Sequence, residues 1–521
     1  MESYFSVAML GVILPLTVLL YQLVPPRVRP YVLLAASCVF YASVSGVLIA
    51  FVLLSAVSIW LVGLALSSLD RQQAAARSAA ADADARRAMK RRYRRYRRGA
   101  VTVGVAVNIG LLAVLRYLPH FVPAGGVLDI SGIGVPMGIS FYSLQAVSYV
   151  VDVYRGGVQA ERNPLRLALF LSFFPQVMEG PISRYGQVGA SLSAGRSVTA
   201  DGLWSGSVRI MWGLVKKMVV ADRVNVLVKT VFSDHAAYDG GVIALAAALY
   251  TLQLYCDFSG TMDFAVGAGR IFGVTMPENF RQPFASHTAA EFWQRWHISL
   301  GAWFRDYVFY PVSLSAPVKR VTGAARRVLG NRVGPLAASG IALGCVWLGN
   351  GIWHGAGSQY LLFGLYYFVL IWLGGFAGLA GDAVCGRMGV SRSGAAWRAW
   401  QRVRTLAVIV VGELIFRASS AGDALAMLGR LVGGFTFASA ADGTVLGLGM
   451  DAADFALVAV AILVLAAVGR ARESGVHPLA RLCPAPYAGR AAVVMTLFLV
   501  AIVFGAYGEN YQPVDPMYAQ F

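Results

Sequence analysis

The sequence has little charge and little cysteine. Charged residues make up 13% of its 521 residues and hydrophobic residues make up 57%, whereas a typical soluble domain carries about 25% charged residues. The cysteines are odd in number and scattered, without the spacing of metal ligands, so neither a disulfide framework nor a zinc site is expected. They are Cys38, Cys256, Cys345, Cys385 and Cys483. The composition therefore excludes a water-soluble globular enzyme and a disulfide-stapled secreted domain.

Long apolar runs take the place of the missing charge. Runs near membrane-spanning length recur along the whole chain, and the clearest are 6–24, 99–118, 241–254, 361–377, 455–468 and 491–506. We predict an all-α polytopic membrane protein with roughly 10 to 12 membrane-embedded helices, some too short to cross fully. The first run has no basic residue before it and no small-residue cleavage site before Pro25. We expect it to be a retained helix and not a signal peptide.

Acidic residues are scarce, and the basic residues are unevenly placed. The chain has 44 Lys and Arg against 26 Asp and Glu, and the densest block is "RRAMKRRYRRYRR", 86–98, within a basic segment 70–98. In a membrane protein such a block predicts a cytoplasmic loop that can contact anionic lipid headgroups, and no nucleic-acid partner is expected.

The remaining basic segments predict the orientation of the chain. Segments 319–332, 387–404 and 470–490 are also basic, and paired helices between them keep all of these segments cytoplasmic. Both termini, including the tail 508–521, are then expected outside. We find no solenoid-type repeat and no long linker, so a single membrane domain, 1–521, is predicted.

Two stretches interrupt the apolar pattern in the first half of the chain. In "SFFPQVMEGPISRY", 172–185, two prolines and a glycine are expected to break any helix and to place Glu179 beside irregular backbone. Such backbone at membrane depth needs protein or water around it. In "YTLQLYCDFSGTMDFAVGAGRIFG", 250–273, Asp257 and Asp263 are six residues apart and do not share a helix face. Internal ion pairs are the expected state of these two carboxylates.

Two further stretches hold the histidines of interest. They are "EFWQRWHISLGAWFRDY", 291–307, and "GNGIWHGAGSQY", 349–360. Of the six histidines, only His297 and His354 lie amid apolar, tryptophan-rich sequence. A buried neutral imidazole suits a general base that acts on a hydroxyl group. The pattern alone also fits two structural histidines, so both interpretations stay open.

Other catalytic arrangements lack support. The sequence has no G-x-S-x-G elbow, which argues against a Ser-His-Asp hydrolase. Gly267, Gly269 and Gly273 form a loose glycine series, but no strand is predicted before them. A nucleotide-binding βαβ unit is therefore not expected.

Several phrases, taken together, resemble the membrane-bound O-acyltransferase (MBOAT) family, and most of all its bacterial branch that acetylates alginate. The phrases are "GISFYSLQAVSYVVDVYRG", "FFPQVMEGPISRY", "GLVKKMVVADR", "YTLQLYCDFSGTMDFAVGAGRIFG", "PENFRQPF", "EFWQRWHISLGAWFRDYVFYPV" and "GIWHGAGSQYLLFGLYY". They fill a signature core at 135–367, and "IFRASSAGDAL" extends the similarity further along the chain. A related branch of the family transfers D-alanine to teichoic acid.

The resemblance implies helices around a central reaction chamber, where an acyl group passes from a cytoplasmic thioester to an acceptor reached from outside. His354 of "WHG" matches the family's signature histidine and is the expected general base, and His297 matches its second histidine motif. Residues expected to line the chamber or the donor path are Trp293, Arg295, Trp296, Trp303, Arg305, Asp306, Trp353, Asp257 and Glu179.

The resemblance also implies the donor, the partners and the location. Acetyl-CoA or another acyl thioester is expected as a donor substrate, with no bound cofactor and no metal. An extracytoplasmic SGNH-type acetyltransferase or a polysaccharide acceptor is the expected partner. The expected location is the bacterial cytoplasmic membrane.

Three sequence segments depart from the alginate-type pattern, namely the 86–98 block, "MEGP" and "YPVSLS". Alternatives therefore stay open. They are transfer of D-alanine or of a longer acyl group, a transporter that uses the buried charges, and a scaffold that organises a polysaccharide-modifying complex.

Overall fold

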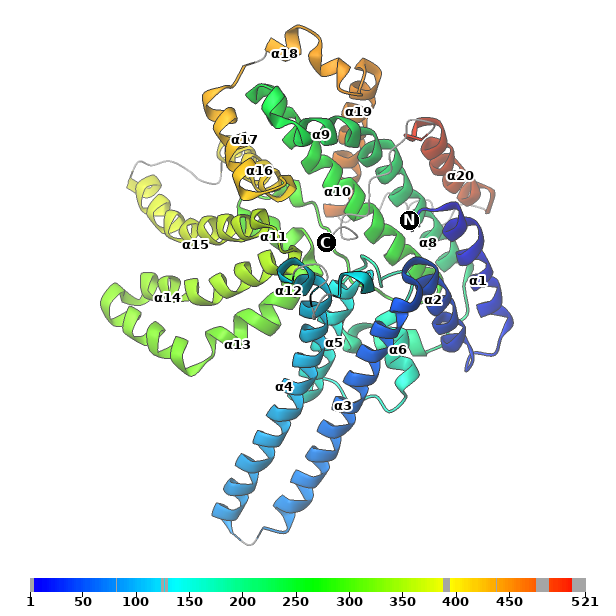
Figure 1. Ribbon diagram of the computed structural model, residues 1–521, viewed down its shortest axis with the longest axis vertical. Coiled ribbons are helices and arrows are strands. Elements are labelled where there is room, and N and C mark those ends of the chain that lie inside the picture. Colours follow the sequence, from blue (N-terminus) through cyan, green and yellow to red (C-terminus); the bar gives the residue numbers. More distant parts are fainter. Residues whose placement is uncertain are drawn as a thin grey trace. The chain divides into compact units, whose positions relative to one another are not determined.

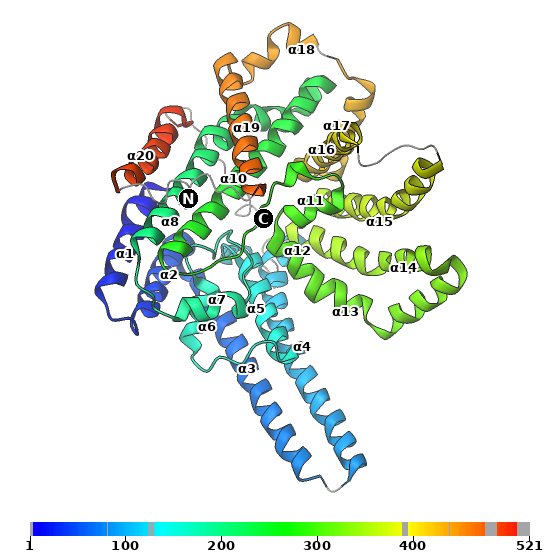
Figure 2. The same cartoon turned by 180° about the vertical axis from the view of Figure 1, so that it is seen from behind.

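A computed structural model describes residues 4–80, 82–122, 126, 130–387, 394–436, 438–474 and 487–507, and these residues form helices and connecting segments with no strand among them (Figures 1 and 2). Seven helical runs are long and apolar enough to cross a membrane: Arg29–Ser78, Ala83–Phe121, Gly240–Ile271, Ala316–His354, Ser358–Gly381, Ala452–Glu473 and Tyr487–Phe504. The all-α, polytopic class is confirmed. The total of 10 to 12 embedded helices and the central chamber stay predictions.

The contacts group the chain into two compact units. Unit 1 takes in Met1–Ile210 and Thr261–Pro277, and unit 2 takes in Met211–Gly260 and Glu278–Met517. Each unit is described separately below. The single domain 1–521 stays a prediction, and the tail 508–521 lies outside the described residues.

Unit 1 contains the first seven helices and parts of two more. They are α1 (Leu14–Leu23), α2 (Arg29–Ser45), α3 (Ile49–Ser78), α4 (Ala83–Phe121), α5 (Ile139–Arg155), α6 (Pro164–Ser172), α7 (Tyr185–Ser193), most of α8 (Ala200–Val215) and the end of α10 (Gly240–Ile271). Its core is aromatic, because Tyr4 stacks on Phe264 at 4.8 Å and on Phe40 at 5.7 Å between ring centroids. The Asp263 carboxylate pairs with Arg209 at 2.5 Å, which confirms the ion pairing expected for that carboxylate.

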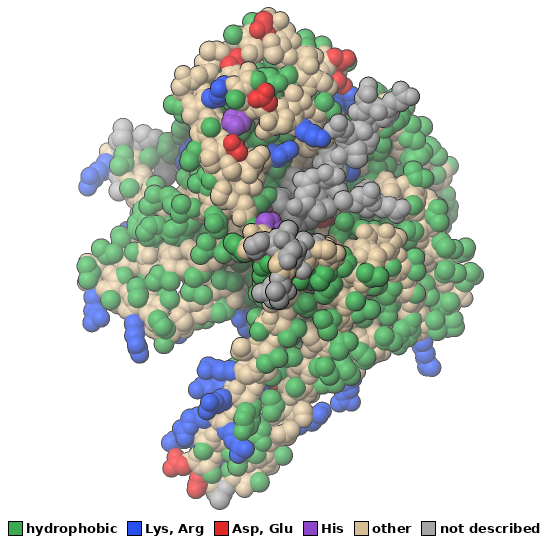
Figure 3. Space-filling model, in the orientation of Figure 1, with side chains coloured by type: hydrophobic (Ala, Val, Ile, Leu, Met, Phe, Trp, Pro, Cys, Tyr) green, Lys and Arg blue, Asp and Glu red, His purple; other side chains and the backbone are tan. Residues whose placement is uncertain are grey.

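The basic segment 70–98 is helical over nearly all its length, although the sequence suggests a loop. Residues up to Ser78 continue α3, and α4 begins at Ala83 with Asp82 as its N-cap, whose side chain accepts the Ala85 amide at 2.7 Å. Alanine, arginine and lysine all favour helix, so the segment needs no apolar core to be helical. Figures 1 and 2 show α3 and α4 side by side, with their joined ends projecting away from α5 and α6. Lys and Arg side chains gather along that projection (Figure 3).

The backbone around Glu179 is irregular, as predicted. No helix runs between Ser172, where α6 ends, and Tyr185, where α7 begins. Almost all of this connection is buried, and the Glu179 side chain is itself buried. Protein therefore surrounds the irregular backbone that the sequence places here.

Unit 2 carries both histidines of interest. Its helices are α9 (Asp222–Ser233), α11 (Ala289–Arg295), α12 (Ile298–Phe304), α13 (Tyr310–Ser313), α14 (Ala316–His354), α15 (Ser358–Arg387), α16 (Ala395–Arg417), α17 (Ala421–Gly433), α18 (Ala438–Ala441), α19 (Ala452–Glu473) and α20 (Tyr487–Phe504), together with the start of α10. The backbone of α14 is kinked at Gly330, whose φ of 78° suits glycine.

A close hairpin of α14 and α15 forms the frame of the candidate site. A Cβ on Gly351 would meet the Tyr360 carbonyl oxygen at 2.5 Å, and one on Gly364 would meet the Trp347 carbonyl oxygen at 2.5 Å. Only glycine lets the two backbones approach this closely. The spacing brings the side chains of the two helices into direct contact next to His354.

Candidate active site

His354 is the last residue of α14, and aromatic rings surround its imidazole. The ring centroids of Trp353 and Phe416 lie 4.9 Å from that of His354, Phe363 lies at 5.9 Å and Tyr360 at 6.3 Å. The residue is 4% exposed. These rings come from α14, α15 and α16, so three helices fix the plane of the imidazole.

His297 occupies the junction between α11 and α12. Its φ is 46°, a left-handed conformation that is uncommon for a residue other than glycine. The backbone is held by the Ile298 amide, which donates to the Asn279 carbonyl oxygen at 3.0 Å. Strain held in place by surrounding contacts is common at functional sites, and here it turns the imidazole into the buried interior of unit 2.

Asn279 determines the tautomer of His297. The Asn279 Oδ1 atom accepts the backbone N–H of Ser299 at 2.9 Å and lies 3.4 Å from His297 Nδ1, whereas Nδ2 of the same amide lies nearer, at 3.2 Å. An amide nitrogen can only donate, so Nδ1 accepts in the shorter contact. We therefore assign the proton of the neutral ring to Nε2, from which His297 can donate a hydrogen bond.

Trp353 contacts both histidines. Its ring centroid is 4.9 Å from His354 and 6.0 Å from His297. The ring centroid of Phe258, from α10, lies 4.8 Å from that of His297. The structure therefore brings His297, His354 and Trp353 into one aromatic cluster.

Two of the remaining predicted tryptophans pack close to this cluster. The ring centroid of Trp293 lies 5.1 Å from that of Trp347 and 4.9 Å from that of Tyr367, and Trp296 packs on Phe280 at 5.0 Å. These two rings pack α11 against its neighbours. Trp303 is buried on α12, where it contacts Phe304 and Tyr307.

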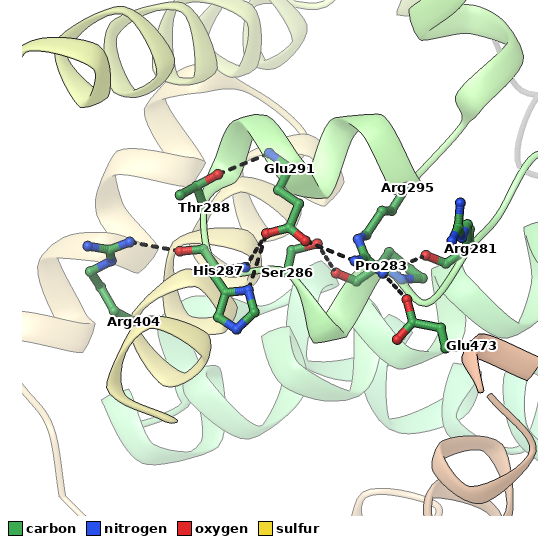
Figure 4. A network of polar contacts seen from close by, with 9 residues as sticks. All are labelled: Arg281, Pro283, Ser286, His287, Thr288, Glu291, Arg295, Arg404 and Glu473. Carbon is green, nitrogen blue, oxygen red and sulfur yellow. Dashed lines mark hydrogen bonds and ion pairs between the residues drawn. The ribbon is translucent and has the colours of Figure 1, made fainter. Parts of the chain in front are cut away.

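Arg295 belongs to a polar network on α11 (Figure 4). Its guanidinium pairs with Glu291 at 3.0 Å and with Glu473 of α19. Partial burial raises the pKa of Glu291, but the backbone N–H of His287 and the charge of Arg295 outweigh this effect, so the pKa lies below its ordinary value. The observed contacts of Arg295 thus connect α11 to α19.

The other charged residues predicted for the site have different surroundings. The Arg305 side chain is 57% exposed and pairs with its neighbour Asp306 at 2.8 Å. Asp257 pairs with Lys217 at 3.0 Å, and the same ammonium contacts Asp222 at 3.2 Å. The internal pairing expected of Asp257 is confirmed.

Glu179 belongs to unit 1 and is described with that unit. Chamber lining by the predicted charged residues, namely Arg295, Arg305, Asp306, Asp257 and Glu179, stays a prediction. Among the described residues, no group of three or more His, Cys, Asp or Glu side chains gathers as metal ligands would.

Sequence reasoning missed the roles of Asn279, Tyr360 and Phe416. Each lies in or beside a phrase that carries the family resemblance, yet none has a chemistry that is visible in sequence. The signal that could have found Asn279 is the "PENFRQPF" loop, in which two prolines bracket a short polar segment that contains this amide.

Comparisons with known protein families and sequences find membrane-bound acyltransferases. The profile of the membrane-bound O-acyltransferase family, MBOAT, matches residues 157–325, inside the predicted signature core. A probable alginate O-acetylase AlgI of Pseudomonas fluorescens is 34% identical over 57% of the chain and 54% of its own length. A protein of the same description from Pseudomonas putida is 30% identical over 82% of the chain and 80% of its length.

Another relative is named for a different activity. A teichoic acid D-alanyltransferase of Bacillus subtilis is 33% identical over 45% of the chain and 58% of its own length. The chain spans about half the length of the first relatives it matches.

Proposed function

Because the chain belongs to the membrane-bound O-acyltransferase family, we propose that it transfers an acyl group from a thioester to a hydroxyl acceptor. The observation that carries the proposal is the pair of buried histidines that both contact Trp353. One of them ends a long helix and the other has a fixed tautomer. The two rings supply a proton acceptor and a hydrogen-bond donor within one water-poor cluster.

His354 acts as the general base. It removes the proton of the acceptor hydroxyl as that oxygen attacks the thioester carbonyl carbon, a role worth about 10²- to 10⁴-fold in rate. The tetrahedral intermediate then collapses, the carbon–sulfur bond breaks, and the proton passes to the departing thiolate. No covalent enzyme intermediate is needed.

His297 acts as a hydrogen-bond donor. Asn279 keeps the proton on Nε2, so this atom can stabilise the negative charge that develops on the carbonyl oxygen. A preorganised donor of this kind contributes about 10²- to 10³-fold. The two histidines therefore have different roles, although both are buried among aromatic rings.

The acyl group is an acetyl group from cytoplasmic acetyl-CoA, and the acceptor belongs to an extracytoplasmic polysaccharide, reached through an SGNH-type acetyltransferase partner. The names of the Pseudomonas relatives support this choice. The basic segments support insertion in the bacterial cytoplasmic membrane with the donor on the cytoplasmic side.

The test uses purified protein in liposomes with acetyl-CoA labelled in the acetyl group and alginate oligosaccharide as the acceptor probe, with and without an SGNH-type acetyltransferase. Release of CoA and transfer of label are measured for the wild type, His354→Ala and a control, His120→Ala, which changes an exposed histidine. We expect turnover in the wild type and the control, and none in His354→Ala. Full turnover in a folded His354→Ala variant would contradict a chemical role for this histidine.

D-alanyl transfer is the second candidate, and the Bacillus subtilis relative favours it. A D-alanyl thioester of a carrier protein, added in competition with labelled acetyl-CoA, separates the two. Suppression of acetyl transfer together with D-alanyl turnover would replace acetyl by D-alanyl as the acyl group.

A further inference from the structure

A second group of buried polar side chains lies next to His354, and the proposed chemistry does not use it. Trp293 of α11, Tyr367 of α15 and Glu413 of α16 come together within unit 2. Tyr367 is 0% exposed and Glu413 is 2% exposed. The Trp293 indole nitrogen is also buried.

One ring contact and one close backbone approach bring these three residues near one another. The Trp293 and Tyr367 rings meet edge to face at 4.9 Å. A Cβ on Gly412, the residue before Glu413, would collide with the Tyr367 hydroxyl oxygen, so that hydroxyl lies against the backbone of α16. The Glu413 carboxyl is close enough to act electrostatically on the Tyr367 hydroxyl.

None of the three polar groups has a hydrogen-bond partner among the residues that the structure describes. The neighbouring Tyr366 is different, because its hydroxyl donates to the Val408 carbonyl oxygen at 2.8 Å. More than nine in ten buried polar groups in proteins are paired, and an unpaired one costs about 1–3 kcal/mol. Two donors and one carboxyl group without partners at a single place indicate a site for a polar ligand.

The position of the group relative to His354 indicates which ligand. Trp347, which stacks on Tyr367 at 5.2 Å, precedes His354 by seven residues on α14, an offset of about 10 Å at 1.5 Å per residue. Glu413 precedes Phe416, the ring that touches His354, by three residues, or about 5 Å. The group therefore lies roughly 5–10 Å from the base along the helix axes.

From His354, the group lies toward the membrane side from which the thioester donor is expected to enter. On α14, Trp347 lies between His354 and the basic segment 319–332, and on α15, Tyr367 lies between Tyr360 and Arg387. Both segments are predicted to be cytoplasmic by their charge. A thioester donor would therefore pass this group on its way to His354.

We propose that Trp293, Tyr367 and Glu413 bind the amide and hydroxyl groups of the pantetheine arm of the acyl donor, an inference that rests on the proposed thioester chemistry. The indole N–H and the phenol O–H donate to an amide carbonyl oxygen, and the carboxyl group accepts from an amide N–H or a hydroxyl. A peptide-like chain advances about 3.5 Å per unit, so the second amide and the hydroxyl groups of the arm, about two to three units from the sulfur, reach the group.

The same arm occurs in CoA and in carrier proteins that bear phosphopantetheine, so the subsite recognises the chemistry that both donors share. It also explains why a buried carboxyl group is tolerated at Glu413, which lacks a countercharge among the described residues. A neutral amide ligand satisfies its hydrogen-bonding capacity without the cost of a second buried charge.

The test compares three acetyl donors of decreasing length: acetyl-CoA, S-acetylpantetheine and S-acetyl-N-acetylcysteamine. Tyr367→Phe and Glu413→Gln are compared with the matched control Tyr366→Phe, each after a thermal unfolding check. We expect Tyr367→Phe and Glu413→Gln to lower kcat/KM by about 5- to 100-fold for the two long donors, as loss of a buried hydrogen bond implies. With the shortest donor we expect less than about a threefold loss in both variants.

Equal losses with all three donors would overturn the proposal, because a general packing defect would then account for them. Unchanged kcat/KM with the long donors would also overturn it, and so would a loss confined to the KM of the acceptor. A comparison of kcat/KM for acetyl-CoA with kcat/KM for an acetylated carrier protein identifies which of the two donors supplies the arm. A wild-type protein that is inert with every thioester would contradict the proposed function itself, and the subsite proposal with it.

Discussion

At the scale of single residues, the candidate site depends on one indole and one amide. Trp353 contacts both imidazoles, and the shorter contact of the Asn279 amide with His297 Nδ1 favours the tautomer with its proton on Nε2. Neither side chain performs proton transfer in the proposed reaction. Both act by restricting the geometry and tautomer of the groups that do.

The donor role of His297 can be tested with a pair of substitutions. A glutamine side chain can place an amide N–H near the position of Nε2, whereas leucine cannot donate. We expect His297→Leu to lower kcat by about 10²- to 10³-fold and His297→Gln to lower it by no more than about tenfold. Steady-state acetyl transfer measures both. A glutamine variant as inactive as the leucine variant would indicate that the imidazole acts as a base or only as a packing residue.

Sequence identified the two histidines but not their neighbours. Histidine is informative because it is rare in apolar sequence, and so His297 and His354 stand out. Asn279 and Phe416 are of common type, and their importance comes from contacts between segments far apart in the chain. Charged residues were the least predictable, since Arg295 pairs with Glu473 across more than a hundred residues of intervening sequence.

At the scale of helices, the α14–α15 hairpin positions the base. Its two close approaches, at Gly351 and Gly364, allow the side chains next to His354 to meet. A methyl group at either position would push the backbones apart. The aromatic rings around His354 would then lose contact with one another.

Glycine substitutions on the hairpin provide a matched comparison. Gly351→Ala places a Cβ against the Tyr360 carbonyl oxygen, while Gly374→Ala, on α15, meets nothing within 4 Å. We expect Gly351→Ala to lower the free energy of unfolding by about 1–3 kcal/mol and to reduce turnover. Gly374→Ala should leave turnover unchanged and raise stability by up to about 1 kcal/mol. Thermal unfolding and acetyl transfer measure the two effects, and equal behaviour of the variants would contradict the close packing.

The helices themselves were partly predictable. Apolar run length predicted α4 and α10, which include the runs 99–118 and 241–254, while the prolines and the glycine of 172–185 predicted the break around Glu179. It failed at 70–98, because an apolar-run criterion detects the membrane-buried part of α4 and not its helical extension into polar sequence. Helix propensity and the Asp82 cap determine that extension.

At the scale of the whole molecule, the basic segments predict the sidedness of the chain. The predicted sidedness is tested with single cysteines that are introduced into a cysteine-free variant and labelled with a membrane-impermeant thiol reagent. Ala88→Cys, on the exposed part of α4, should react only from the cytoplasmic side, and Thr444→Cys, between α18 and α19, only from the outer side. Labelling of inverted and right-side-out vesicles gives the result. Reaction of both cysteines from the same side would contradict the predicted topology.

The position of His354 at the end of the helical segment that follows the kink at Gly330 makes the orientation of the proposed base sensitive to the number of residues in that segment. Each residue of an α-helix adds about 100° of rotation and 1.5 Å of rise. One residue inserted or deleted between Gly330 and His354 would turn the imidazole away from Phe416 and Tyr360, although no side chain had been altered. We therefore expect insertions or deletions before Gly330 to preserve acyl transfer, and those between Gly330 and His354 to abolish it.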